Sequence, residues 1–521
     1  MNKYTRRLVS LILILVLSLG AAVPALGGWR EEQSVLASAY DAAKAYLIDC
    51  AETRTPIVDS VGGEWLILGL ARAGERDSAF FDAYYENLRQ YVKEHALTGG
   101  RLHRVKSTEN DRVILALTAM GLDPRSIAGV DLVQGLSGMD FVKGVGINGV
   151  IWALIALDSG RYEIPSAPEG ETQFTREAAV DLILEKQHDD GGWSLTGDTA
   201  DTDMTGMALQ ALTPYVKGDE RVAAAVERGV ACLSGLQKEN GGFSTMDDMN
   251  VESCAQAVTA LSALGIDAGA DERFVKGGVS LIDALLSFQN ADGSFRHLSG
   301  DTVMNQVSTE QAFYALVAYV RFLEGRNSLY DMSDAEKRII LPFRDVKKGD
   351  WFYPAVLYAY RNQLFNGTSA DTFSPDKAMN RAMLVTVLYR LDGGKAEGNA
   401  PFSDVPSGEW YSEAVAWAAG NGIINGFDDG TFKPLAPVTR QQIAVILHRY
   451  AERLAGEPLI IPEMDVAAAF PDWGDVADWA VDGMTWACAC GYINGKSGKL
   501  VPAGNATRAE VAMILSRVFP D

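Results

Sequence analysis

A stretch of about fifty residues occurs three times in the C-terminal third of the chain and limits the possible folds more than any other feature. Its middle copy is Phe402–Tyr450, FSDVPSGEWYSEAVAWAAGNGIINGFDDGTFKPLAPVTRQQIAVILHRY. In each copy an Asn-Gly pair follows a tryptophan by 15 residues, and the tryptophans are Trp351, Trp410 and Trp479. Spacing this regular indicates a tandem repeat in which each copy is one supersecondary unit.

Each copy is predicted to fold as a helix, a turn and a second helix. In the middle copy, the apolar residues of Ser412–Ala419 have helical spacing. The second helix begins at Thr439, whose side chain and that of Gln442 are placed to satisfy each other's backbone N–H groups in a capping box. The corresponding pairs are Thr507 with Glu510, which completes the box, and Asn380 with Met383, which does not.

An arginine stands at the first position of each second helix: Arg381, Arg440 and Arg508. The helix dipole disfavours a cation there by a few tenths of a kcal/mol. A positive side chain added to the free N–H groups of a helix start makes an anion site. The alternatives are an exposed arginine, or one paired with a nearby acid such as Asp404. The identical register in three copies favours a bound anion.

These motifs resemble a known family. The pattern F-x-D-V, W-Y, A-x-x-x-G-I-I-N-G, D-G-T-F-x-P and T-R-A-E resembles the S-layer homology (SLH) module of Gram-positive surface proteins, over residues 341–521. The resemblance implies modules at 341–395, 401–455 and 466–521, packed as a three-pronged, mostly helical unit. It also implies non-covalent binding of a pyruvylated secondary cell-wall polysaccharide in grooves between the prongs. Carried over by motif, the groove residues are Asp345, Trp351 and Arg381; Asp404, Trp410 and Arg440; and Asp472, Trp479 and Arg508.

The chemistry of these residue types agrees with such a ligand. A guanidinium fork suits a pyruvyl carboxylate, and an indole face suits the apolar side of a sugar. The alternative for the tryptophans is packing of the helix start onto the bundle. Only the third copy keeps Thr-Arg-Ala-Glu intact, from Thr507 to Glu510, which predicts the strongest groove there.

The first 27 residues have the features of a secretory signal. Three cations, Lys3, Arg6 and Arg7, precede the apolar stretch Leu8–Gly20 and a run of small residues. We therefore expect a secreted protein at the cell wall or S-layer surface, with no membrane insertion after signal removal. Residues 28–340 carry most of the net charge of −22, which argues against nucleic acid as a partner.

Residues 28–325 contain a second, longer repeat. Gln187-x-x-x-Gly-Gly-Trp193 returns as Gln237-x-x-x-Gly-Gly-Phe243 and Gln289-x-x-x-Gly-Ser-Phe295. Each motif joins an amphipathic helix to a small, almost wholly apolar one of the kind found in protein interiors. With weaker copies upstream, the pattern predicts six helical hairpins, with outer helices near 31–50, 77–96, 126–142, 176–187, 221–237 and 275–289.

This repeat resembles the α/α-toroid of prenyltransferases and squalene-cyclase-type terpene cyclases. The expected fold is therefore all-α: a six-hairpin α/α-toroid over 28–325, a linker over 326–340, and the helical SLH unit. The same toroid also appears in cobalamin carriers and polysaccharide lyases, so the resemblance does not specify an activity.

Acidic and amide side chains precede the inner helices and are expected to share one mouth of the toroid. The candidate ligand site is Asp201, Asp203, Asn250, Glu252 and Asn305. The alternative is helix capping, which Asp and Asn side chains do well.

Two functions remain open for the toroid. It binds an unknown ligand at the surface, or it is an enzyme of terpene-cyclase or polysaccharide-lyase type that uses the acidic mouth. The sequence shows no complete D-x-D-D acid motif, no zinc-ligand set and no nucleophile–base pair, so we expect a binding module with no cofactor, no metal and no catalytic residue.

Overall fold

The computed structural model describes Arg30 and residues 33–76, 78–245, 248–369, 371–396 and 398–520. The signal predicted over residues 1–27 lies outside these ranges. The described chain divides into two compact units, with the division between Arg338 and Ile339.

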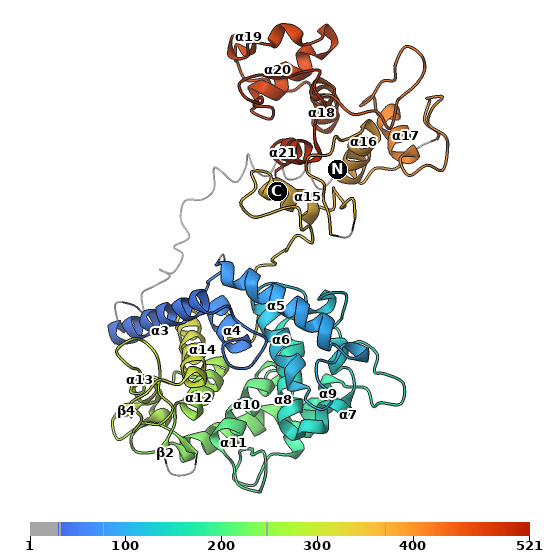
Figure 1. Ribbon diagram of the computed structural model, residues 1–521. Coiled ribbons are helices and arrows are strands. Elements are labelled where there is room, and N and C mark those ends of the chain that lie inside the picture. Colours follow the sequence, from blue (N-terminus) through green and yellow to red (C-terminus); the bar gives the residue numbers. More distant parts are fainter. Residues whose placement is uncertain are drawn as a thin grey trace. The chain divides into compact units, whose positions relative to one another are not determined.

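In the described residues of the first unit, six inner helices form a closed ring. Each packs against the next along the chain, and the last, α14, packs against the first, α4 (Figure 1). The ring consists of α4 (Glu64–Arg72), α6 (Thr108–Ala119), α8 (Gly146–Ser159), α10 (Thr202–Leu212), α12 (Val251–Leu264) and α14 (Gln306–Leu323). This closure confirms the predicted toroid from the protein's own helix packing.

Outer helices alternate with the inner ones along the chain (Figure 1). They are α3 (Ser34–Thr53), α5 (Ala79–His95), α7 (Met139–Val142), α9 (Arg176–Glu185), α11 (Glu220–Leu236) and α13 (Leu281–Leu286). The described strands form two antiparallel hairpins, β1 (Ser244–Thr245) with β2 (Asp248–Met249) and β3 (Val275–Lys276) with β4 (Val279–Ser280). The chain is therefore all-α apart from these short pairs.

Two outer helices are much shorter than predicted. The segment 126–142 forms 3-10 turns and only the four-residue α7, because its several glycines and the preceding Pro124 favour turns. In 275–289, Gly277 and Gly278 adopt positive φ and make the tight turn between β3 and β4. Helix α13 then begins at Leu281, and its N-cap residue Ser280 forms a capping box with Asp283.

The three glutamine motifs join neighbouring hairpins. The side-chain amide of Gln187 donates to Gly191 O in its own turn (2.7 Å) and to Ala225 O of α11 (2.8 Å). Gln289 donates to Ala39 O of α3 at 2.8 Å, which ties the last hairpin to the first. The aromatic residue of each motif is fully buried: Trp193, Phe243 and Phe295.

Residues 326–338, which we expected to be a linker, pack on the toroid instead. Leu329, Tyr330 and Met332 are buried, and Met332 N donates to Ser159 O at the end of α8. Asp334 forms ion pairs with Arg72 of α4 (2.7 Å) and with Arg321 of α14. This segment therefore covers the C-terminal ends of the inner helices, because its apolar side chains find buried sites there.

One described helical stretch, Met139–Ser159, is long and apolar enough to cross a membrane by length and composition alone. Most of it is buried inside the toroid unit, and its larger part is the inner helix α8. A core helix of a folded unit has the same properties.

The second unit is built from pairs of helices contributed by different repeats. The second helix of one repeat packs against the first helix of the next: α16 against α17, α18 against α20, and α21 against α15. The helices are α15 (Tyr353–Arg361), α16 (Arg381–Asp392), α17 (Ser412–Gly420), α18 (Arg440–Ala455), α19 (Val466–Ala469), α20 (Val481–Ala489) and α21 (Arg508–Val518).

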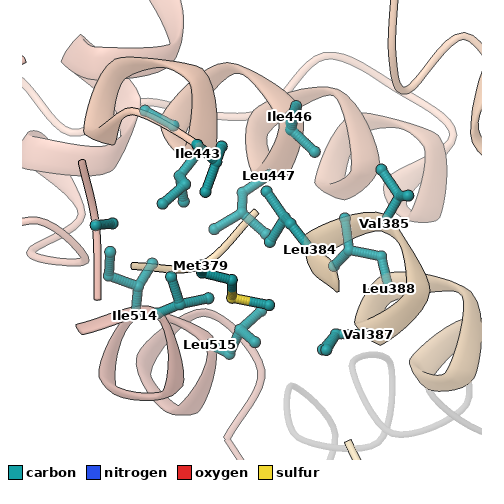
Figure 2. Close-up of a cluster of buried hydrophobic side chains, with 14 of the residues drawn as sticks. Met379, Leu384, Val385, Val387, Leu388, Ile443, Ile446, Leu447, Ile514 and Leu515 are labelled. Atoms are coloured by element: carbon teal, nitrogen blue, oxygen red, sulfur yellow. The ribbon is translucent and has the colours of Figure 1, made fainter. Parts of the chain in front are cut away.

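The three repeats also meet in a cycle of backbone hydrogen bonds. Met379 N donates to Ala506 O, Ala506 N to Val438 O, and Val438 N to Met379 O, at 2.9, 3.1 and 2.8 Å. All three side chains are fully buried. Around them pack apolar residues of α16, α18 and α21, among them Leu384, Leu447 and Leu515 (Figure 2). The core of this unit is thus shared equally by the three repeats.

Candidate ligand-binding sites

The predicted groove aspartates hold the turns of the second unit. Asp345 accepts hydrogen bonds from the backbone N–H groups of Phe373 (2.8 Å) and Ser374 (2.7 Å). Ser374 has a positive φ of 58°, an uncommon conformation for a residue with a side chain, and the aspartate stabilises it. The same arrangement recurs at Asp404 with Phe432 and Lys433, and at Asp472 with Leu500 and Val501. These carboxylates are therefore occupied by backbone.

Each predicted arginine reaches into the following repeat. The Nε of Arg381 donates to Phe432 O (2.8 Å), that of Arg440 to Leu500 O (2.7 Å), and that of Arg508 to Phe373 O (2.9 Å). The three arginines are only 5–6% exposed. The arginine sites therefore lie at the junctions between repeats, and the third arginine closes the cycle onto the first repeat.

Of the three arginines, Arg381 has the fewest interactions at its terminal guanidinium nitrogens in the described structure. Its guanidinium carbon lies 4.5 Å from the ring centre of Phe432 and 5.0 Å from that of Phe427, which holds the plane in place. Burial lowers its pKa to about 10, and nearby Asp404 opposes that shift, so the side chain is charged at neutral pH. Within the described ranges, its two terminal nitrogens have no hydrogen-bond partner, whereas Arg508 Nη2 donates to Asn366 O (2.7 Å).

The three tryptophans are exposed. Trp351, Trp410 and Trp479 have 60%, 56% and 57% of their surface accessible. Trp351 and Trp410 contact the next aromatic residue edge-on, at ring-centre distances of 5.4 and 5.2 Å, which leaves the rest of the indole open. Packing onto the bundle therefore does not account for these residues. Each repeat presents one exposed indole and one buried arginine.

At the toroid mouth, three of the five predicted ligand residues are helix caps. Asp201 accepts from Met204 N (2.7 Å), Asn250 from Ser253 N (2.8 Å) and Asn305 from Ser308 N (3.1 Å). They start α10, α12 and α14, respectively. The capping alternative is the one that the geometry favours for these residues.

Asp203 and Glu252 differ from the caps because each interacts with a serine of the next inner helix, Asp203 with Ser253 and Glu252 with Ser308. Glu252 of α12 accepts from Ser308 Oγ of α14 (2.5 Å) and lies 2.7 Å from His297 Nδ1. Burial raises the pKa of Asp203 to about 6, and its Oδ1 is buried without a hydrogen-bond partner. The pKa of this carboxyl at the mouth therefore lies closer to neutral than that of an ordinary aspartate.

The toroid interior contains an aromatic and amide cluster that the sequence did not single out. Gln256 donates to the hydroxyl of Tyr314 (2.7 Å), and Gln210 donates to Gln256 Oε1 (3.0 Å). The ring centre of Trp65 lies 5.2 Å from that of Trp152 and 5.8 Å from that of Tyr314, with the rings tilted by 55° and 49°, respectively. Glutamines inside nearly apolar inner helices are the sequence signal that could have revealed it. Over the described ranges, no group of three or more His, Cys, Asp or Glu side chains is placed to hold a metal ion.

Comparison with known families agrees with the repeat structure. The sequence profile of the S-layer homology domain matches residues 342–382, 401–444 and 469–512. An endoglucanase of Bacillus sp. (strain KSM-635) is 31% identical over 189 residues, which are 36% of this chain and 20% of that protein. The surface-layer 125 kDa protein of Lysinibacillus sphaericus is 30% identical over 125 residues (23% and 10%). A cellulosome-anchoring protein of Acetivibrio thermocellus is 28% identical over 157 residues (29% and 35%). The chain thus spans about a third or less of the length of these relatives.

Solved structures similar to this chain include terpene cyclases. The type II terpene cyclase MstE from Scytonema has a TM-score of 0.38 at 14% identity, covering 55% of this chain and 99% of that one. The ent-copalyl diphosphate synthase from Streptomyces platensis has a TM-score of 0.32 at 17% identity, covering 49% of each chain. The domain matches and the relatives together point to a secreted location at the cell wall or S-layer surface.

Proposed function

We propose, from the premise that residues 342–512 contain three S-layer homology domains, that the second unit anchors the protein non-covalently to a pyruvylated secondary cell-wall polysaccharide. The proposal is carried by one observation, the buried guanidinium of Arg381 with both terminal nitrogens unpaired in the described structure. The toroid is then the part displayed at the surface.

Both the charge of Arg381 and the rings around it favour a carboxylate-bearing sugar as the ligand. A buried guanidinium has lost most of its hydration, so a ligand carboxylate that pairs with it gains charge-assisted hydrogen bonds in two places at once. Phe427 and Phe432 hold the Arg381 plane before the ligand arrives, which reduces the ordering cost of binding. The exposed indoles of Trp351, Trp410 and Trp479 offer apolar faces to sugar rings.

Replacing Arg381 with glutamine is expected to weaken binding to isolated cell walls about tenfold or more, since a hydrogen bond to a charged group contributes roughly 1.5–3 kcal/mol. The measurement is co-sedimentation of the purified full chain with walls over a range of protein concentrations. Lys395→Gln, which removes an exposed cation of the same unit, is the matched control and should bind as wild type. Walls stripped of pyruvyl groups should retain the wild type poorly, and undiminished retention would contradict the role of the carboxylate.

For the toroid we propose ligand binding at the mouth and in the interior, rather than catalysis. Support comes from the unpaired, buried Asp203 Oδ1 at the mouth and Gln210 Oε1 in the interior cluster. The alternative, an enzyme of terpene-cyclase or polysaccharide-lyase type, uses the same acid, because a carboxyl with a pKa of about 6 can donate a proton.

The comparison of Asp203→Asn with Asp201→Asn separates these functions. Asparagine caps a helix as well as aspartate does, so the Asp201 variant is the matched control. The full chain is screened by thermal shift against corrinoids, polyprenyl diphosphates and acidic oligosaccharides. We expect at least one compound to raise the melting temperature of the wild type and of the control, and to raise that of Asp203→Asn less. We expect no product from any compound. Turnover by the wild type that Asp203→Asn abolishes would make the toroid an enzyme.

A further inference from the structure

Glu510 lies beside an arginine of the preceding repeat. One of its oxygens, Oε2, accepts from Thr507 N (2.9 Å) and completes the capping box of α21. The other, Oε1, lies 3.9 Å from Nη1 of Arg440 and 3.5 Å from Nζ of Lys496. The side chains of Arg440 and Glu510 are only 8% and 13% exposed, so water screens this pair weakly. Glu510 thus presents a carboxylate to the arginine from inside the protein.

The same position can be identified at the other two junctions. Arg440 N donates to Gly504 O, Arg381 N to Ala436 O, and Arg508 N to Lys377 O, at 2.9, 3.0 and 3.0 Å. Each of these carbonyl groups lies six positions before the third residue of the helix that follows it in the chain. That third residue is Glu510 after Gly504, Gln442 after Ala436 and Met383 after Lys377. One junction therefore contains an acid where the others have an amide and a thioether.

The junction of Arg440 also differs in what packs against the guanidinium plane. Arg381 lies over Phe427 and Phe432, and Arg508 lies 5.2 Å from the ring centre of Phe365 and 4.6 Å from that of Phe373. Arg440 makes the same kind of hydrogen bond, to Leu500 O, but leucine has no ring on which a guanidinium can stack. Its guanidinium has the charge of Glu510 nearby in place of an aromatic face at the equivalent position.

We propose that the three arginine sites are unequal and that Glu510 is a built-in competitor at one of them. The inference rests on the proposed binding of a carboxylate-bearing sugar. The Glu510 carboxylate repels a ligand carboxylate and already interacts with Arg440, so the sugar binds first at Arg381 and Arg508. This assignment differs from the expectation that an intact Thr-Arg-Ala-Glu marks the strongest groove, because the glutamate of that motif acts on the arginine of the preceding repeat.

Two reciprocal substitutions test the proposal. Glu510→Gln removes the competing charge, and the cap should persist because Gln442 makes the same box with Thr439 in this chain. Gln442→Glu introduces an acid at the corresponding position beside Arg381. Each variant is checked by thermal melting, since an unchanged midpoint shows that the cap and the fold are intact.

The readout is the Nε–H resonance of each arginine in NMR spectra of the full chain. Each Nε donates to a backbone carbonyl, so the three signals report on ordered groups. The probe is a methyl hexoside with a pyruvyl ketal, and the hexoside without it is the control. In the wild type, Arg440 should require roughly tenfold more ligand than Arg381 or Arg508 for half of its shift. Glu510→Gln should remove this difference, and Gln442→Glu should move Arg381 to the weak class.

The outcomes separate the two proposals. If none of the three signals responds to the pyruvyl hexoside, the proposed function fails. If all three respond at one concentration in the wild type, or if the substitutions leave their order unchanged, the sites bind the carboxylate but Glu510 is no competitor.

Discussion

Replacing Asp334 with alanine is expected to destabilise the toroid unit by about 2–3 kcal/mol, less than the cost of breaking a fully buried ion pair because the aspartate itself is 31% exposed. Asp334 pairs with Arg72 and Arg321, whose side chains are only 3% and 2% exposed. Both arginines retain backbone carbonyl partners, including Ser328 O for Arg72 (2.8 Å) and Asn327 O for Arg321 (2.8 Å). Without the aspartate, two buried cations at the ends of α4 and α14 would face each other uncompensated.

Urea unfolding with hydrogen exchange at α4 and α14 measures this effect within the full chain. Glu336→Gln is the matched control, since it removes an acid from the same segment that forms an exposed pair with Arg76. Exposed pairs contribute about 0–1 kcal/mol. An Asp334→Ala variant as stable as this control would show that the ion pairs of Asp334 add no stability to the toroid.

Glu310 should make the toroid less stable as pH rises. Burial raises its pKa to about 7, bonds from Gln306 and Gly62 N oppose the shift, and the unfolded chain has the ordinary value near 4.5. Below the unfolded value, both states are protonated and the group has no differential effect. Between the two values, the unfolded state ionises first, so stability falls. Above the folded value, the loss levels off at roughly 3 kcal/mol.

The Glu310→Gln variant should therefore lose the share of Glu310, roughly 3 kcal/mol, from the decline in unfolding free energy between pH 5 and pH 8, while the shares of Glu64 and Asp203 remain. The matched control is Glu169→Gln, the same change at an exposed position of the same unit, which should follow the wild-type profile. Urea titrations at several pH values provide the measurement. A decline that persists in full with Glu310→Gln would assign it to other buried carboxyls, such as Glu64, whose pKa burial also raises to about 7.

Repeat spacing located the helical units, and the family resemblances of the repeated motifs supplied both expected architectures. The Gln-Gly-aromatic motif marks where each hairpin turns, because the glutamine must reach two carbonyl groups and the aromatic residue must be buried. Periodicity failed where tertiary packing decided the outcome. Val275–Gln289 is apolar enough for a helix, but Gly277 and Gly278 favour a hairpin. Residues 326–338 lack a repeat, so no sequence pattern indicated that Tyr330 and Met332 would be buried.

The candidate sites were predicted only in part, for a related reason. A repeat tells which residues are equivalent but not which copy packs on which. The arginines were singled out by register, yet their partners Phe432, Leu500 and Phe373 belong to neighbouring copies. At the toroid mouth, capping and ligand binding require the same residue types, so the two could be separated only by hydrogen bonds seen in the structure, such as that from Met204 N to Asp201 Oδ1.

The cyclic packing of the second unit has a consequence for how such a chain can be arranged. Because α21 packs against α15, and the hydroxyl of Tyr358 donates to Phe519 O, the end of the third module lies against the start of the first. At every junction, the second helix of one module packs against the first helix of another. This holds where the two modules are consecutive in the chain and also where the third module meets the first. The order of the modules along the polypeptide therefore depends only on which of the three junctions has no direct chain connection. A circularly permuted chain that began with the second module and ended with the first would retain every helix pair.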